Sequence, residues 1–142
     1  PSIDFLTEME SGLEVEADPE QLFRVLFNLC RNSVEVLKAD LDTDLTIVRR
    51  IVVSAERSGG VVEIRVSDTG PGMPEMARKE LFKPFKGSAR AGGTGLGLAI
   101  ARELITAHGG QIDLADTAAH GTTFCIQLPD RPVPIDKFRA RG

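Results

Sequence analysis

The strand-like segments of this chain come in neighbouring pairs, and this arrangement restricts the fold more than any other feature. Residues 46–57 and 61–68 are separated by Gly59-Gly60, and the second stretch alternates apolar and polar residues. A glycine pair in such a place favours the tight turn of an antiparallel hairpin. A second pair, 112–115 with 122–128, is expected near the end of the chain. Strands that follow one another directly exclude a doubly wound parallel sheet, in which each strand is followed by a helix.

Two helices are predicted beside these strands. Asp18 can cap the first helix and Pro19 suits its first turn, and apolar residues recur at helical spacing to about Ala39. The second helix is expected over 96–108, where Gly109-Gly110 ends it. Both helices are amphipathic enough to need an apolar surface to pack on, which the strands can provide.

Shorter elements are expected in two places. Residues 3–6 and 13–16 are predicted as short strands ahead of the first helix, and 81–85 as a short apolar segment within a glycine-rich stretch. The whole pattern predicts an α+β fold, a two-layer α/β sandwich in which helices cover one face of a mixed, largely antiparallel sheet.

Length and composition indicate one soluble domain, which we place at 1–130, with 131–142 as a tail. The net charge of −4 and the absence of Trp and Tyr argue against nucleic acid as a partner. Cys30 and Cys125 lie in apolar runs, which predicts buried free thiols. No apolar run approaches the roughly 20 residues of a membrane span. A cytoplasmic location is therefore expected for the domain, while a membrane anchor elsewhere in a longer protein stays open.

A pair of asparagines marks the first helix. Asn28 and Asn32 are four residues apart, so their amides share one helical face, which we expect to lie opposite the side formed by Leu22, Leu26 and Leu29. The amide oxygen is a neutral, hard ligand that suits a magnesium ion already bound to phosphate oxygens. Solvated amides on a wet helix face are the alternative.

A carboxylate stands where the second strand of the hairpin ends. Asp68 is followed by Gly70 and Gly72. A carboxylate in this place can accept a hydrogen bond from the amino group of adenine, whereas guanine would present a repelling carbonyl oxygen. The glycines allow the backbone to turn sharply and to approach a flat ring. A simple turn begun by the aspartate is the alternative.

The glycine-rich stretch 92–98 leads directly into the second helix. Its backbone N–H groups and the helix N-terminus favour phosphate, and its composition is that of a mobile lid. Just before it, Phe82 and Phe85 either contact the nucleotide or anchor the loop to the core. Lys86 and Arg90 are the cations nearest the expected phosphates, and either could neutralise charge during phosphoryl transfer.

Taken in order, these features resemble the motifs of the GHKL superfamily of ATPases and, within it, of sensor histidine kinases. The matching motifs are the N box Asn28/Asn32, the first glycine box Asp68-x-Gly70-x-Gly72, the F box Phe82-x-Pro84-Phe85 and the second glycine box Gly93-x-Gly95-x-Gly97. Each motif is loose by itself, but the four in sequence are specific, and with Gly121-Thr122-Thr123-Phe124 they cover nearly the whole chain.

The resemblance implies the Bergerat fold, with ATP and Mg²⁺ bound between the first helix and the lid. It implies that Asp68 reads adenine, that Thr122 and Gly72 support it through water, and that Asn28 and Asn32 serve the metal and the phosphates. The full set of nucleotide contacts that it implies is Asn28, Asn32, Asp68, Gly70, Gly72, Phe82, Phe85, Gly93, Thr94, Gly95, Leu96, Gly97, Leu98 and Thr122.

One position distinguishes kinases from ATP-hydrolysing relatives. Gyrase-type and chaperone-type members carry a water-activating glutamate where this chain has Asn28, which cannot accept a proton near neutral pH. Glu35 and Val36 resemble the nitrogen-regulation and dicarboxylate-sensor branch. The resemblance therefore implies transfer of the γ-phosphoryl group to a histidine on a separate dimerisation hairpin, with homodimers formed only by the full-length protein and a response regulator as its further partner.

Neither histidine of this chain suits the role of phosphoacceptor. His108 closes a helix, where an imidazole can cap carbonyl groups, and His120 lies in a predicted turn. Two other functions stay open at this point: a GHKL protein serine kinase of the anti-sigma type, and a degenerate phosphorelay adaptor that keeps the fold without using ATP.

Overall fold

The computed structural model describes residues 3–9, 13, 17–39, 49–70, 75–83, 96–115 and 121–129, with the backbone alone at 36, 38, 39 and 75–77. Its elements, in chain order, are β1 (Asp4–Met9), α1 (Pro19–Ala39), β2 (Arg50–Ser58), β3 (Val61–Asp68), α2 (Glu75–Glu80), α3 (Gly97–Ala107), β4 (Gln111–Leu114) and β5 (Thr122–Pro129).

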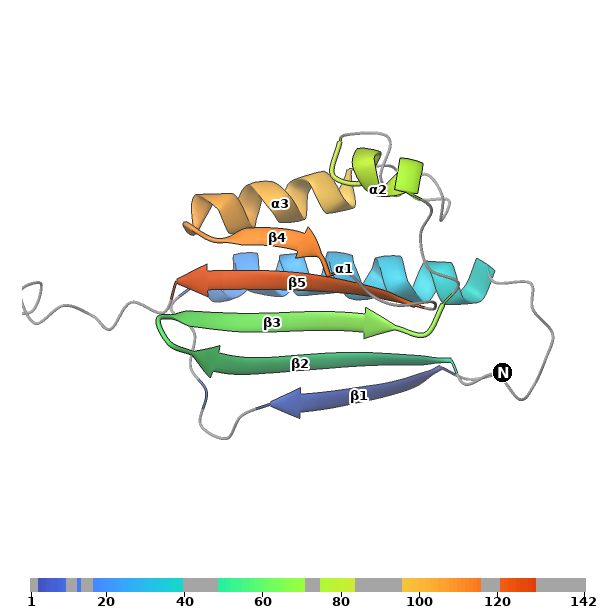
Figure 1. The fold of residues 1–142 in the computed structure, drawn as a ribbon, viewed down its shortest axis with the longest axis horizontal. Helices are drawn as coiled ribbons and strands as arrows, with labels where there is room; N and C mark the ends of the chain where they lie inside the picture. The colour runs from blue at the N-terminus through green and yellow to red at the C-terminus, as the bar shows by residue number, and fades with distance from the viewer. Residues whose placement is uncertain are drawn as a thin grey trace, which may run out of the picture.

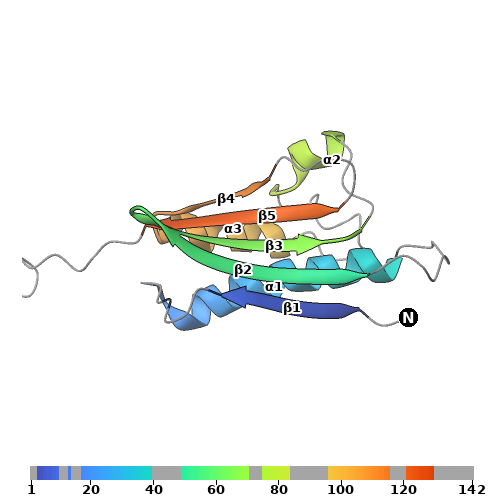
Figure 2. The ribbon, with the colours of Figure 1, turned by 60° about the horizontal axis from the view of Figure 1, so that its bottom comes forward.

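The strands form a single five-stranded sheet in the order β1-β2-β3-β5-β4. β1 pairs parallel with β2, and all other neighbours pair antiparallel. Helices α1 and α3 lie side by side on one face of this sheet (Figures 1 and 2). The predicted two-layer fold with a mixed, largely antiparallel sheet is therefore confirmed.

The hairpin of β2 and β3 has the predicted two-residue turn. Ser58 pairs with Val61 across Gly59-Gly60, and Gly59 has a φ of 63°, a conformation that glycine adopts without strain. Alternate residues of both strands face the helices, so the period-two pattern in the sequence becomes one buried face. The buried hydrophobic residues of the sheet are Ile51, Val53, Ala55, Val62, Ile64, Val66, Ile112, Phe124, Ile126 and Leu128.

The start of α1 and the end of α3 are both capped. Asp18 Oδ1 accepts the backbone N–H of Gln21 at 3.0 Å, as the predicted cap requires. At the other helix, Gly109 has a φ of 78° and donates to the carbonyl oxygen of Thr106, while Gly110 donates to that of Ile105. This pair of bonds is a Schellman motif, so the two glycines end α3 as predicted.

The structure differs from the sequence predictions in several element bounds. β1 covers 4–9 instead of 3–6, and all six of its residues are exposed. Of the predicted strand 13–16, only residue 13 is described, so that prediction is untested. The hairpin's first strand begins at Arg50, and the short helix α2 was not predicted.

Three predictions about the whole chain have different outcomes. Cys30 and Cys125 are free thiols but only half-buried. Cys30 packs against the edge of the core, and Cys125 lies on the strand face opposite its buried neighbours Phe124 and Ile126. Burial is the main cause that raises the pKa of Cys125 to about 11, and the hydrogen bond with Glu63 is the next.

No helix in the described part of the chain is long and apolar enough to cross a membrane. The domain boundary at 130 stays a prediction, because residues 130–142 lie outside the described residues.

Candidate functional site

The predicted site residues that the structure describes gather at one end of the helix–sheet interface. Four element ends lie there together: the C-terminal half of α1, the end of β3, the beginning of β5 and the beginning of α3 (Figure 1). Within the sheet, Asp68 and Thr122 are direct cross-strand partners. Residues far apart in the sequence are thus brought to one place by the strand order.

Asp68 is buried, with 6% of its surface exposed. Its Oδ1 accepts the backbone N–H of Gly70 at 2.9 Å, so the aspartate does begin a turn, as the simpler alternative expected. This turn does not exclude a ligand role, since a carboxylate has two oxygens and about four acceptor positions. The hydrogen bond instead holds the carboxylate in a fixed orientation at the strand end.

Gly121 makes this arrangement possible from the opposite strand. It has a φ of 88°, and a Cβ placed on it would overlap the carbonyl oxygen of Asp68. Its N–H donates to the carbonyl oxygen of Gly70 at 2.8 Å. The chain entering β5 therefore lies directly against the turn after β3, which only glycine allows here.

Asn28 joins α1 to the beginning of α3. Its Nδ2 donates to the carbonyl oxygen of Gly97 at 3.1 Å. The bond uses the amide nitrogen and directs the first turn of α3 toward the asparagine, while Oδ1 keeps its acceptor capacity for a ligand. No side chain caps the N-terminus of α3, so its first N–H groups suit an anion.

Asn32 lies deeper than the sequence suggested. It is 5% exposed, and neither its amide oxygen nor its amide nitrogen has a hydrogen-bond partner among the residues that the structure describes. The expectation that both amides lie opposite the leucine side of α1 is therefore wrong for Asn32. The exposed face instead carries the stacked rings of Phe23 and Phe27, since the sheet and α3 together cover more of the helix than one leucine stripe.

Two further buried hydroxyl groups belong to this cluster. Thr122 Oγ1 and Ser33 Oγ are buried and have no partner within the described ranges. Ser33 was missed by the sequence analysis. The sequence did contain an indication of its burial, because Ser33 lies four positions from both Leu29 and Leu37 and so falls within the apolar stripe of α1. Buried polar groups without partners cost about 1–3 kcal/mol each, so a cluster of them points to a bound polar ligand or ordered water.

The F-box segment is described as far as residue 83. The ring of Phe82 packs edge-on against Phe124 with centroids 6.3 Å apart, and the Arg102 guanidinium lies 5.7 Å above it. The neighbouring Leu81 is fully buried. These contacts match the alternative in which Phe82 anchors the loop to the core, and its contact with nucleotide stays a prediction.

The structure describes the second glycine box only from residue 96 onward. Leu96 precedes α3, Gly97 begins it, and Leu98 is buried in the core. The backbone of Leu98 belongs to the first turn of α3, and the contact of this residue with nucleotide stays a prediction. The remaining predicted site residues lie outside the described residues, namely Gly72, Phe85, Lys86, Arg90, Gly93, Thr94 and Gly95, as does His120.

The donors available to a metal are the amide oxygens of Asn28 and Asn32. The described residues contain no cluster of three or more His, Cys, Asp or Glu side chains that could hold a metal on their own. Two neutral amide oxygens fit a Mg²⁺ ion whose other ligands are phosphate oxygens and water. The residues present therefore fit a metal that arrives with a nucleotide.

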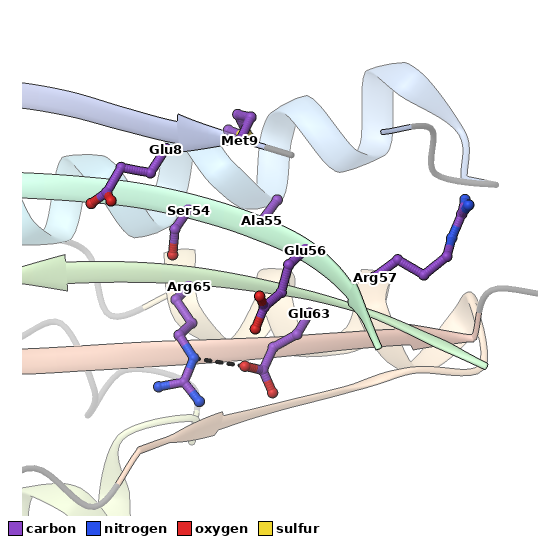
Figure 3. A pocket seen from close by; sticks show the side chains of 8 residues that line it. All are labelled: Glu8, Met9, Ser54, Ala55, Glu56, Arg57, Glu63 and Arg65. Carbon is purple, nitrogen blue, oxygen red and sulfur yellow. Dashed lines mark hydrogen bonds and ion pairs between the residues drawn. The ribbon is translucent and has the colours of Figure 1, made fainter. Parts of the chain in front are cut away.

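A separate hollow of about 610 Å³ lies on the opposite face of the sheet (Figure 3). It is lined by Glu8, Met9, Ser54, Ala55, Glu56, Arg57, Glu63 and Arg65. The Arg65 guanidinium donates to Glu63 at 2.7 Å, and this hydrogen bond lowers the pKa of the Glu63 carboxyl. None of the predicted nucleotide contacts lines this hollow, so its size does not make it the functional site.

Comparisons with known proteins show the family to which this chain belongs. Residues 17–132 match the family model described as histidine kinase-, DNA gyrase B- and HSP90-like ATPase. The sensory histidine kinase/phosphatase NtrB of Salmonella typhimurium is 39% identical over 122 residues, which is 83% of this chain and 34% of NtrB. The chain thus spans about a third of the length of this relative.

Solved structures give the same result. The catalytic domain of the histidine kinase ThkA superposes with a TM-score of 0.73 at 32% identity, covering 90% of this chain and 78% of that one. ThkA in complex with the response regulator TrrA gives 0.71 at 31%, covering 92% and 35%. Full-length ShkA in complex with AMPPNP gives 0.73 at 29%, covering 89% and 25%.

Proposed function

Because this chain belongs to the family of histidine kinase-, DNA gyrase B- and HSP90-like ATPases, we propose that it is the ATP-binding catalytic domain of a sensor histidine kinase. Its similarity to NtrB supports the nitrogen-regulation branch. The parent protein would transfer the γ-phosphoryl group of ATP to a histidine on its own dimerisation hairpin and then serve a response regulator in the cytoplasm. The match to ThkA in complex with TrrA supports that type of partner.

The observation that carries this proposal is the cluster of buried polar groups at one end of the helix–sheet interface. Asn32 and Thr122 present side-chain atoms without partners in the described part of the chain. Asp68, the cross-strand partner of Thr122, has its carboxylate fixed by the hydrogen bond from Gly70. A core with no ligand would favour apolar residues at these positions. A purine edge and its ordered waters would supply the missing hydrogen bonds.

In this arrangement each group of the chain has a separate task. Asp68 accepts a hydrogen bond from the adenine amino group, and Thr122 supports it through water. The uncapped first turn of α3 receives phosphate oxygens, held near α1 by the bond from Asn28 to Gly97. Asn28 and Asn32 would hold Mg²⁺ through their amide oxygens, and the bound ion would neutralise charge on the phosphates.

The site favours transfer to a protein group over hydrolysis. During transfer, the bond from the γ-phosphorus to the β–γ bridging oxygen breaks and a bond to an imidazole nitrogen forms. ADP leaves with the bridging oxygen, and the imidazole proton passes to a base beside the acceptor histidine. A hydrolysing site needs a base that accepts a proton from water. Asn28 occupies the position expected for that base and has no basic atom. The chain therefore positions ATP, while the acceptor histidine supplies the nucleophile.

Phosphotransfer between two polypeptides tests this proposal. The chain is incubated with Mg-ATP labelled at the γ-phosphate, alone and with a dimeric hairpin from the parent protein that carries the acceptor histidine. We expect label on the hairpin only, in an acid-labile form typical of phosphohistidine. An acid-stable label on a serine of a partner protein would favour the anti-sigma type of kinase. Absence of both ATP binding and transfer would favour the phosphorelay adaptor, and either result contradicts the proposal.

A further inference from the structure

Helices α1 and α3 are hydrogen-bonded to each other at two separated points. Near the predicted phosphate site, Asn28 donates to the carbonyl oxygen of Gly97 at 3.1 Å. At the far end of α3, His108 Nε2 accepts the backbone N–H of Asp18 at 3.1 Å. The two helices run in opposite directions (Figures 1 and 2), so the start of α1 meets the end of α3.

The contacts of His108 assign the tautomer of its ring. Nδ1 lies 2.8 Å from the carbonyl oxygen of Leu104, which can only accept, so Nδ1 must carry the proton. Nε2 receives the N–H of Asp18, so it must be the acceptor. These two contacts assign the ring to the tautomer with the proton on Nδ1, and both ring nitrogens are used.

The surroundings of the ring hold it in place. It packs with Ala17, Gln21, Leu22, Val25, Ile105 and Leu128 around a small apolar space that has no room for a water molecule. None of these six residues is ionisable, and the ionisable residue brought to the ring by the hydrogen bonds is Asp18, whose own Oδ1 is used by Gln21. Two residues after His108, Gly110 lies so close to Gln127 that a Cβ on it would overlap the carbonyl oxygen of Gln127. The position of the C-terminal end of α3 relative to the sheet is therefore tightly restricted.

We propose that His108 is a positioning residue for the nucleotide. Its bond to Asp18 fixes the end of α3 against the start of α1, and α3 carries that constraint to Gly97 and the phosphate-binding turn. This inference rests on the proposed function, because it assigns His108 to the site where ATP would bind.

Helix geometry explains why a contact at the far end can matter. α3 has 11 residues and is therefore about 16 Å long. A tilt of about 5° at one end moves the other by about 1.4 Å over that length. Hydrogen bonds from backbone N–H groups to oxygen span only about 2.7–3.2 Å, so a displacement of about 1 Å is sufficient to weaken phosphate binding.

Two substitutions separate the inter-helix bond from simple capping of α3. In His108→Gln, the amide can reach as far as Nε2 and keep the bond to Asp18. In His108→Asn, the shorter amide can reach only as far as Nδ1, so it keeps the cap on Leu104 and loses Asp18. If capping alone matters, the Asn variant should behave like the parent.

Calorimetric titration with Mg-ATP of the folded variants tests the proposal. We expect His108→Asn to bind about fivefold more weakly, the equivalent of one lost hydrogen bond, and His108→Gln to stay within about twofold of the parent. The exposed Glu103→Gln serves as a control on the same helix. Equal affinity of the Asn variant and the parent, or equal weakening by both variants, would overturn the proposal.

A spectroscopic measurement distinguishes this failure from failure of the proposed function. Long-range ¹H–¹⁵N NMR of the parent chain should show the less common imidazole tautomer, with the proton on Nδ1, both without and with Mg-ATP. A proton on Nε2 would refute the bond to Asp18 whether or not ATP binds. If the parent binds no ATP at all, the proposed function fails, and the tautomer still reports on the helix contact.

Discussion

At the residue scale, the buried polar atoms without partners say most about the site. Asn32, Ser33 and Thr122 place such atoms in the same end of the domain. The Asn28/Asn32 spacing predicted the shared helix face from the sequence, but burial depends on how α3 and the sheet cover α1. A single sequence does not show how much of α1 is covered by α3 and the sheet, so the burial of Asn32 and of Ser33 could not be predicted.

Ser33→Ala gives a prediction at this scale. Removing a buried hydroxyl that has no partner in the described structure should stabilise the nucleotide-free domain by about 1 kcal/mol. That corresponds to an increase in Tm of about 3 °C for a domain of this size. Calorimetric melting without nucleotide measures it, with Ser54→Ala on the opposite face as the control. A lower Tm would mean that the hydroxyl makes a stabilising bond, and would remove Ser33 from the ligand-dependent cluster.

At the element scale, the strands with one buried face were predicted close to their observed bounds, whereas the exposed strand β1 was predicted only in part. In β3 and β5, alternate residues are buried, which produces the period-two pattern of the sequence. All residues of β1 are exposed, so its sequence has no such constraint, and its parallel pairing with β2 depends on a distant contact. The short helix α2 was not predicted for a different reason, because six residues are too few for a helical period to be recognised.

The junction of β3 and β5 gives a second prediction. Gly121→Ala should lower the free energy of unfolding by about 2 kcal/mol or more, since φ is 88° and the added Cβ meets the Asp68 carbonyl. Gly60→Ala is the matched control, because no atom lies within 4 Å of an added Cβ there and its φ is not positive. Urea unfolding of both variants measures the difference. Equal stability would show that β5 does not lie against the turn as described.

At the scale of the whole molecule, the helix pair α1 and α3 has the predicted nucleotide site at one end and a hydrogen-bonded helix contact at the other. The Asn28–Gly97 bond marks the first and the His108–Asp18 bond the second. The sequence predicted His108 as a structural residue that caps carbonyl groups, and its bond to Leu104 confirms this. The inter-helix bond could not be predicted, because it joins residues 90 positions apart.

The central claim is that the buried carboxylate at the end of β3 reads adenine, and nucleotide selectivity tests it most directly. The measurement is the calorimetric affinity of the parent chain and Asp68→Asn for Mg-ATP and Mg-GTP. Asparagine can keep the hydrogen bond to Gly70, so the turn should survive while the charged acceptor is lost. We expect the parent to prefer ATP over GTP by about tenfold or more, and the variant to lose about tenfold in ATP affinity. Equal affinity of the parent for both nucleotides, or unchanged ATP binding by Asp68→Asn, would contradict the account.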